Sequence, residues 1–196
     1  VQTVILAIQS GIQLARVELL DEVQMQGMNK YNKDLSFPEK PHLFIEFHGS
    51  ELSTTEQVED FKSISDEFGA YDFKWATKTE DRNRLWKARH DAYWAGKSLW
   101  PQASSLVTDC CVPIASLASC ILKTKEAIKE SDLLAPLVGH VGDGNYHLLI
   151  LFDGSTRDGL KRAKELAGRV NEIALSFGGT ITGEHGVGTG KKNYMY

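Results

Sequence analysis

Three of the six histidines of this chain lie in two glycine-flanked segments close to its C-terminal end. His140 and His147 are in GHVGDGNYH, and Glu184 and His185 stand together in GEHGVG. The GDGN sequence is typical of a hairpin turn, so the strand that ends at His140 and the strand that begins near His147 are expected to converge. With the carboxylate of Glu184, the two imidazoles would form a His, His, Glu set. Such a set suits a divalent transition metal, zinc or manganese, with coordination positions left open.

His185 directly follows Glu184, and two neighbours in an extended segment cannot readily share one metal. A neutral imidazole is suited to accept a proton from a hydroxyl beside the metal, since its ordinary pKa of about 6.5 lies near working pH. We therefore expect His185 to be the catalytic base. The alternative is that each histidine merely ends a strand or loop, with a hydrogen bond to the backbone and no chemical role, since turns need their glycines in any case.

Helices and strands are expected to alternate along the chain and to position these residues. Helical spacing of apolar residues and capping residues predict helices over residues 1–9, 22–29, 53–68, 80–95, 113–130 and 156–177. Alternating or continuous apolar runs predict strands over residues 12–20, 42–48, 71–78, 107–112, 136–141 and 146–152, with a loop over 96–106. Hairpin turns imply antiparallel pairing, so we predict one α+β domain over residues 1–196, a ferredoxin-like antiparallel sheet with helices packed on one face.

Composition excludes several classes of protein. The chain has 196 residues, 42% hydrophobic and 24% charged, which is the balance of a globular domain rather than a disordered one. With 22 basic and 26 acidic residues its formal charge is −4, so no basic field favours nucleic acid. The apolar runs are too short for a membrane span. The three cysteines form neither a CxxC pair nor an even disulfide framework, which favours a reducing compartment. The first residues lack the basic region of a targeting segment, and we expect the chain to be part of a longer protein.

Three motifs resemble a known family. GHVGDGNYH, TITGEHGVG and the upstream LWKARHDAYWA are similar to the C-terminal domain of FAD-linked oxidases of the vanillyl-alcohol oxidase superfamily, and within it to the mitochondrial D-lactate dehydrogenase branch. RVELLD over residues 16–21 resembles the opening strand of that domain. The resemblance covers essentially the whole chain. It implies that this is the substrate-side cap of a flavoenzyme, with the N-terminal FAD-binding domain and the extreme C-terminus outside the sequence.

The resemblance also implies roles for individual residues. His140, His147 and Glu184 match the family's metal ligands, and His185 matches its catalytic base. The implied activity is oxidation of a D-2-hydroxy acid to a 2-oxo acid. His185 would take the proton of the 2-hydroxyl group while a hydride leaves the α-carbon for the FAD. An electron acceptor such as cytochrome c and a mitochondrial location are implied by the same resemblance.

Substrate-binding residues are implied in the same way. Arg89 matches the arginine that holds the substrate carboxylate, and a planar guanidinium suits this because it can form two parallel hydrogen bonds. Arg82 and Arg84 lie on the same predicted helix and are competing candidates. Asn145 could donate a further hydrogen bond to the substrate, although asparagine is also common in turns for its backbone conformation alone.

Two departures from the family pattern bear on the substrate. Members that oxidise hydroxyglutarate carry an asparagine where this chain has Leu149 and a lysine where it has Val107. Apolar residues at both positions favour a smaller substrate without a second carboxylate. We therefore expect D-lactate, oxidised to pyruvate, with glycolate and D-2-hydroxyglutarate as alternatives.

Two other classes of protein remain open from the residues alone. A His, His, Glu set also suits a zinc hydrolase, although the chain lacks HExxH. The second class is a non-catalytic ferredoxin-like interaction domain, in which the histidines have no chemical role. GVGTGKK lacks the spacing of a phosphate-binding loop and does not indicate nucleotide hydrolysis.

Overall fold

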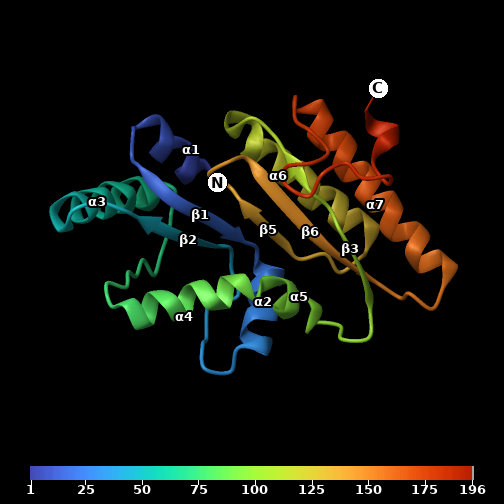
Figure 1. Cartoon of the computed structure of the whole chain (residues 1–196), viewed down its shortest axis with the longest axis horizontal. Helices are drawn as coiled ribbons and strands as arrows, with labels where there is room; N and C mark the ends of the chain where they lie inside the picture. The colour runs from blue at the N-terminus through green and yellow to red at the C-terminus, as the bar shows by residue number, and fades with distance from the viewer. Residues whose placement is uncertain (196) are drawn as a thin grey trace.

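Helices and strands are interspersed along residues 1–195, the part of the chain that the computed structural model describes (Figure 1). The strands are β1 (Leu14–Leu20), β2 (His42–Phe47), β3 (Ser104–Val107), β4 (Cys110–Cys111), β5 (Leu137–His140) and β6 (Asn145–Phe152). The helices are α1 (Gln2–Gln9), α2 (Glu22–Tyr31), α3 (Glu51–Glu67), α4 (Thr79–His90), α5 (Ala92–Lys97), α6 (Ile114–Ser131), α7 (Arg157–Ser176) and the 3-10 turn η1 (Lys192–Tyr194). The last residue of the predicted domain, Tyr196, lies outside the described residues.

The strands form one sheet in the order β2-β1-β5-β6-β3. Strand β4 also pairs with β6, at the N-terminal end of β6, whereas β3 pairs with its C-terminal half. All pairings are antiparallel. The predicted α+β class with an antiparallel sheet is therefore confirmed. In the part of the chain described here, no helix has the length and apolar character needed to cross a membrane.

The long helices α6 and α7 lie side by side over one face of the sheet (Figure 1). Alternate residues of β6, namely Tyr146, Leu148 and Ile150, are fully buried there against Leu117 of α6 and Val170 of α7. Each such side chain contributes about 1.5–3 kcal/mol through removal of apolar surface from water. This core fixes the position of β6. Because successive side chains of a strand point to opposite faces, the residues of β6 that alternate with these three, His147 among them, face the other side of the sheet.

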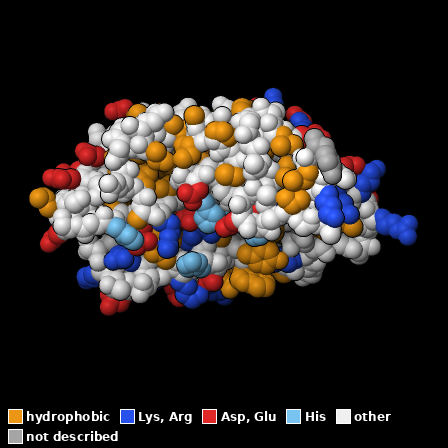
Figure 2. Space-filling model, turned by 45° about the horizontal axis from the view of Figure 1, so that its top comes forward, with side chains coloured by type: hydrophobic (Ala, Val, Ile, Leu, Met, Phe, Trp, Pro, Cys, Tyr) orange, Lys and Arg blue, Asp and Glu red, His pale blue; other side chains and the backbone are white. Residues whose placement is uncertain are grey.

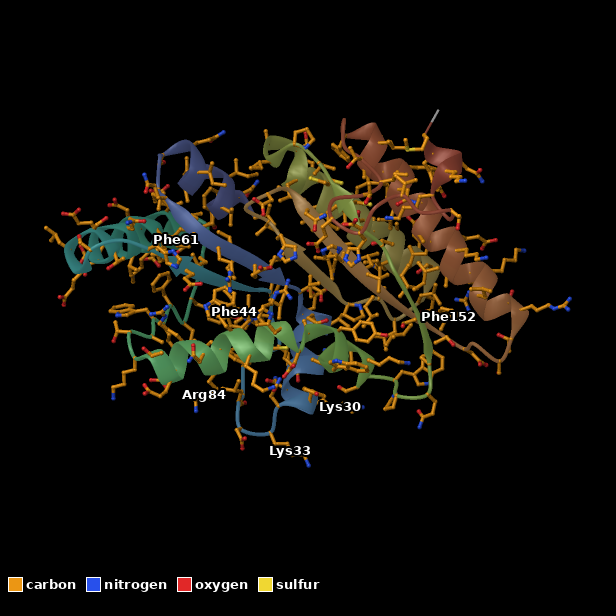
Figure 3. All side chains as sticks on the ribbon, in the orientation of Figure 1. Lys30, Lys33, Phe44, Phe61, Arg84 and Phe152 are labelled. Carbon is orange, nitrogen blue, oxygen red and sulfur yellow. The ribbon has the colours of Figure 1, made fainter. Side chains whose placement is uncertain are left out.

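The opposite face of the sheet is covered only in part. At one end Leu20 of β1 packs with Met25 of α2 and Ala95 of α5, and Phe44 of β2, labelled in Figure 3, lies against this cluster. Helices α2 and α5 approach so closely that a Cβ atom at Gly27 would lie 2.6 Å from the carbonyl oxygen of Ala95. The middle of this face carries polar and charged side chains instead, and these form the candidate site.

Four predicted elements differ from the structure. Residues 71–78, predicted as a strand, have no regular structure, because the segment pairs with no strand and Asp72 has a φ of 58°, which interrupts an extended chain. The predicted helix over 80–95 is divided at Asp91 into α4 and α5. The predicted loop over 96–106 contains the end of α5 and the start of β3.

The predicted strand over 107–112 is also interrupted. It is divided into β3 and β4 at Thr108 and Asp109. At this point the Thr108 hydroxyl accepts a hydrogen bond from the backbone N–H of Leu148, in place of a regular strand acceptor. The interruption places Asp109 between the two strands, where it becomes part of the site.

Candidate metal and substrate site

The β5–β6 hairpin brings His140 and His147 together. The turn between the strands contains Gly144 with a φ of 79°, and a Cβ atom there would lie 2.1 Å from the carbonyl oxygen of Val112, so only glycine fits. The two imidazole rings lie edge to face with their centroids 5.6 Å apart. Both project from the sheet face opposite α6 and α7, as the hairpin interpretation of the sequence predicts.

Glu184 comes from the segment after α7 and lies between the histidines. Its Oε1 atom is 3.3 Å from Nε2 of His140, 3.2 Å from Nε2 of His147 and 3.5 Å from Nε2 of His185. The potential ligand atoms of His140, His147 and Glu184 all lie within 4.8 Å of one another. Asp109, His147 and His185 form a second, overlapping group of the same kind.

Asp109 holds the segment that presents Glu184 and His185. Its Oδ2 atom accepts hydrogen bonds from the backbone N–H groups of Gly183, Glu184 and His185 at 2.8, 3.0 and 2.8 Å, and from the Thr182 hydroxyl at 2.9 Å. Burial alone would raise the pKa of Asp109, but these bonds and one from the Asn145 amide outweigh it and hold the pKa well below its usual range. Asp109 is therefore an ionised anchor, which the sequence analysis did not single out.

Asn145 lies beneath the same segment. Its amide nitrogen donates hydrogen bonds to Asp109 Oδ1 at 2.9 Å and to the Cys110 carbonyl at 3.1 Å. A Cβ atom at Gly183 would lie 1.8 Å from this nitrogen, so the segment rests directly on the amide. Both N–H groups are used inside the protein, and only the buried, unpartnered Oδ1 atom remains for a substrate contact. The main structural role of Asn145 is therefore to support the segment that carries Glu184 and His185.

The hydrogen bonds of the two hairpin histidines determine which ring nitrogen faces Glu184. Nδ1 of His147 donates to the Thr108 carbonyl at 3.2 Å, and Nδ1 of His140 donates to Glu18 Oε1 at 2.8 Å. Both rings therefore present the Nε2 lone pair toward the carboxylate of Glu184. Nε2 of His147 is buried and has no hydrogen-bond partner within residues 1–195. A metal ion would complete its bonding, so the ligand set fits such an ion.

Protonation supports the same arrangement for His147. Burial lowers the pKa of His147, which favours the neutral ring that can donate a lone pair to a metal. The hydrogen bond to Glu18 raises the pKa of His140. In the protonated ring of His140 the second proton is on Nε2, so a metal at this atom would compete with that proton. Metal binding and pH are usually coupled in this way.

Glu18 is a second functional candidate that the sequence analysis missed. It lies in the middle of β1 and is only 5% exposed, which is rare for a carboxylate. Burial raises its pKa, but hydrogen bonds from His140 and Arg89 outweigh this effect and lower the pKa overall. The available indication was an acidic residue within the apolar RVELLD strand, on the same face as Arg16 and Leu20.

Of the three candidate arginines, the structure brings only Arg89 to the histidine cluster. Its Nη2 atom donates to Glu18 Oε2 at 2.8 Å, and its Nε atom is buried without a hydrogen-bond partner in the described part of the chain. Arg82 instead binds Glu46 at 3.2 Å. Arg84, labelled in Figure 3, is 59% exposed and lies 3.6 Å from Asp81.

A cavity of about 620 Å³ adjoins the cluster. Glu18, Arg89 and His140 contribute to its polar wall, and Ile8, Ile12 and Ile114 to its apolar wall. Figure 2 shows histidine side chains beside acidic and basic ones near the middle of the face that it displays. A volume of this size is in the range of small-molecule sites, which typically span about 300–1,000 Å³.

The fold and the cluster together define the class: an α+β domain in which the partly covered face of the sheet carries a group of potential metal ligands beside a partly buried arginine. The model of the family described as FAD linked oxidases, C-terminal domain, matches residues 1–196, and the chain belongs to this family. The resemblance that the sequence motifs indicated is thereby confirmed.

Two named relatives agree with this assignment. A protein of Danio rerio, named probable D-lactate dehydrogenase, mitochondrial, is 43% identical over 98% of this chain and 38% of its own length. One of Arabidopsis thaliana, named D-lactate dehydrogenase (cytochrome), mitochondrial, is 42% identical over 97% of this chain and 34% of its own length. The chain thus spans little more than a third of these relatives.

The structure of 4-ethylphenol oxidase from Gulosibacter chungangensis in complex with isoeugenol superposes with a TM-score of 0.60 at 12% identity. The match covers 85% of this chain and 38% of that one. At this level of identity the similarity concerns the fold alone.

Proposed function

We propose that this chain is the substrate- and metal-binding domain of an FAD-dependent dehydrogenase that oxidises D-lactate to pyruvate. The observation that supports this most directly is the buried, unpartnered Nε2 atom of His147, which faces the same carboxylate oxygen as Nε2 of His140. Family membership favours flavin-linked oxidation over a zinc hydrolase or a non-catalytic domain. The names of the two D-lactate dehydrogenases support the choice of substrate.

His140, His147 and Glu184 would hold the metal, zinc or manganese. When bound, a divalent cation supplies a Lewis acid and a template for the oxygen atoms of the substrate. The protein side of this arrangement is already ordered, because Glu18 and the Thr108 carbonyl fix the two rings and Asp109 fixes the backbone at Glu184. Such outer hydrogen bonds orient the ligands of a metal.

Arg89 would bind the carboxylate of the 2-hydroxy acid. Its Nη2 atom is already bonded to Glu18, so the guanidinium plane is fixed, while the Nε–H group has no partner in the structure. A substrate carboxylate would supply the missing acceptor through a charge-assisted hydrogen bond. The apolar wall of the neighbouring cavity would exclude water from the rest of the substrate.

His185 would remove the proton of the 2-hydroxyl group. Its Nε2 atom lies 3.5 Å from Glu184 Oε1, and its side chain is 57% exposed, so it borders the cluster and remains accessible. The backbone N–H of His185 is held by Asp109, which places the ring beside His147 and Glu184. FAD, bound by the remainder of the protein, would accept the hydride from the α-carbon.

Val107 and Leu149 support a short substrate. They are direct partners across β3 and β6, so their side chains share the sheet face of His147. Leu149 is 7% exposed and packs with Ala103 and Leu151, while Val107 is 40% exposed. Neither offers a cation to a second carboxylate, which favours D-lactate over D-2-hydroxyglutarate. The names of both relatives support a mitochondrial location, and the word cytochrome in the name of the Arabidopsis thaliana protein supports a cytochrome as electron acceptor.

The test uses the full-length flavoprotein that contains this chain. We expect His185→Ala to slow anaerobic reduction of the flavin by D-lactate by about 10²–10⁴-fold, the usual effect of removing a general base. His140→Ala should lose bound metal together with activity. His48→Ala is the matched control, since His48 lies outside the cluster and pairs with Glu46. Undiminished flavin reduction in both site variants, or a metal-free enzyme with full activity, would refute the assigned roles.

A further inference from the structure

Glu18 connects two parts of the site that have different ligands. Its Oε1 atom accepts a hydrogen bond from His140 Nδ1 at 2.8 Å, and its Oε2 atom accepts one from Arg89 Nη2 at 2.8 Å. We propose that Glu18 is a positioning residue that orients His140 for the metal and Arg89 for the substrate carboxylate at the same time. This inference rests on the proposed function of the site.

The position of Glu18 is rigid. It pairs with Phe44 of β2 on one side and with His140 of β5 on the other, so its backbone is held within the sheet. Its side chain is only 7% exposed. The carboxylate cannot move far without loss of both hydrogen bonds. The rigid sheet therefore fixes the positions of the His140 ring and the Arg89 guanidinium through Glu18.

Toward His140, Glu18 determines the tautomer. A carboxylate accepts hydrogen bonds only, so Nδ1 of His140 must carry the proton and Nε2 must present its lone pair to Glu184. A partner that could donate instead would stabilise the opposite tautomer, with a proton on Nε2 where a metal would bind. Loss of such an outer partner typically weakens metal binding by about 10–100-fold.

Toward Arg89, Glu18 fixes the plane of the guanidinium. Arg89 is 13% exposed on its side chain, so its charge needs a partner, and Glu18 is that partner. With Nη2 bonded to Glu18, the buried Nε–H group is left unpartnered. The ordering of Arg89 before substrate arrives lowers the entropy cost of binding the carboxylate.

A glutamine at position 18 separates these effects from ordinary packing. Glu18→Gln keeps the shape of the side chain but provides one carbonyl oxygen and one NH₂ group for two donors. One donor must then face the NH₂ group, so either His140 changes tautomer or Arg89 moves. Glu18→Asp retains the buried charge but is too short to reach both partners, and it serves if the glutamine variant does not fold.

Glu46 offers a matched control on the same face of the sheet. It lies on β2 opposite Arg16, and its side chain is 14% exposed. Its ion pairs are with Arg16, Arg82 and His48, and none of these is assigned to the metal or the substrate. Glu46→Gln therefore removes a partly buried, ion-paired carboxylate from the same sheet face without a change at the site.

The experiment measures two quantities in the full-length flavoprotein: the affinity for zinc or manganese by competition with a chelator, and the KM for D-lactate. In the position 18 variants we expect metal affinity to fall about 10–100-fold or KM to rise roughly tenfold, with both unchanged in Glu46→Gln. Position 18 variants that match Glu46→Gln in both quantities would overturn the role of Glu18. If the unaltered protein neither binds metal nor oxidises D-lactate, the proposed function itself fails.

Discussion

Gly183 is the position at which the smallest change should disable the site. A methyl group there would begin 1.8 Å from the amide nitrogen of Asn145, whereas ordinary contact begins at 3.4 Å. One of the two must therefore move by about 1.6 Å. Asn145 is held by Asp109 and by the Cys110 carbonyl, and the Gly183 segment is held by Asp109 through three backbone N–H groups. Neither side can move without loss of hydrogen bonds.

The cost of Gly183→Ala can be worked from those bonds. If Asn145 yields, the protein loses one charge-assisted bond, worth about 1.5–3 kcal/mol, and one neutral bond, worth about 0.5–1.5 kcal/mol. We therefore expect the free energy of unfolding of the variant to be lower by about 2–4.5 kcal/mol. If the segment yields instead, Glu184 moves by far more than the ±0.2 Å or so that metal–ligand distances tolerate, and metal affinity is lost.

Thermal unfolding and chelator competition on the full-length flavoprotein measure these two outcomes. Gly190→Ala is the control, because a Cβ atom there meets nothing within 4 Å and the glycine lies in the same C-terminal segment. The control should retain the stability and metal affinity of the unaltered protein. A Gly183→Ala protein that also retained both would show that the segment does not rest on Asn145, and the derivation of the site would be wrong.

Three further predictions concern substrate binding, specificity and stability. Arg89→Lys should raise the KM for D-lactate by roughly 10–100-fold, because an ammonium group cannot serve Glu18 and the substrate together, whereas the exposed Arg84→Lys should leave KM unchanged in the same assay. Val107→Lys should increase kcat/KM for D-2-hydroxyglutarate relative to D-lactate, and an unchanged ratio would contradict the assignment of this edge to the substrate. Lys125→Met should lower the free energy of unfolding, measured with denaturant, by about 1–3 kcal/mol without a change in KM. The reason is that the buried Asp21 carboxylate loses the Lys125 ammonium group that lies 2.7 Å away.

The parts of the site that the sequence predicts are those in which geometry is local. His140 and His147 are seven residues apart across a glycine turn, so hairpin geometry alone predicts that they converge. Glu184 and His185 are added to them by residue type, as a carboxylate ligand and a base, and by the family resemblance, because no spacing rule relates a separate segment to the hairpin. The choice of Arg89 over Arg82 and Arg84 likewise required the resemblance and, finally, the contacts.

The parts that the sequence does not predict depend on partners far away in the chain. Glu18 is 122 residues from His140 and 71 from Arg89, and nothing in RVELLD indicates either contact. Asp109 appears from the sequence to be one position of a strand, whereas its function as an anchor depends on backbone N–H groups more than 70 residues later. The alternation at 71–78 predicts a strand that does not form, because alternation cannot supply a neighbouring strand to pair with.

Buried polar atoms without hydrogen-bond partners indicate that the cluster binds a ligand. Among the described residues, four buried side-chain polar atoms have no hydrogen-bond partner, and three of them are Arg89 Nε, Asn145 Oδ1 and His147 Nε2. Each such atom costs about 1–3 kcal/mol when it is left without a partner. A fold that satisfies nearly all of its polar groups elsewhere would not be expected to leave three beside one cluster by chance. A metal at His147 and a carboxylate at Arg89 would remove two of these costs, so the same ligands that explain the chemistry also explain the energetics of the site.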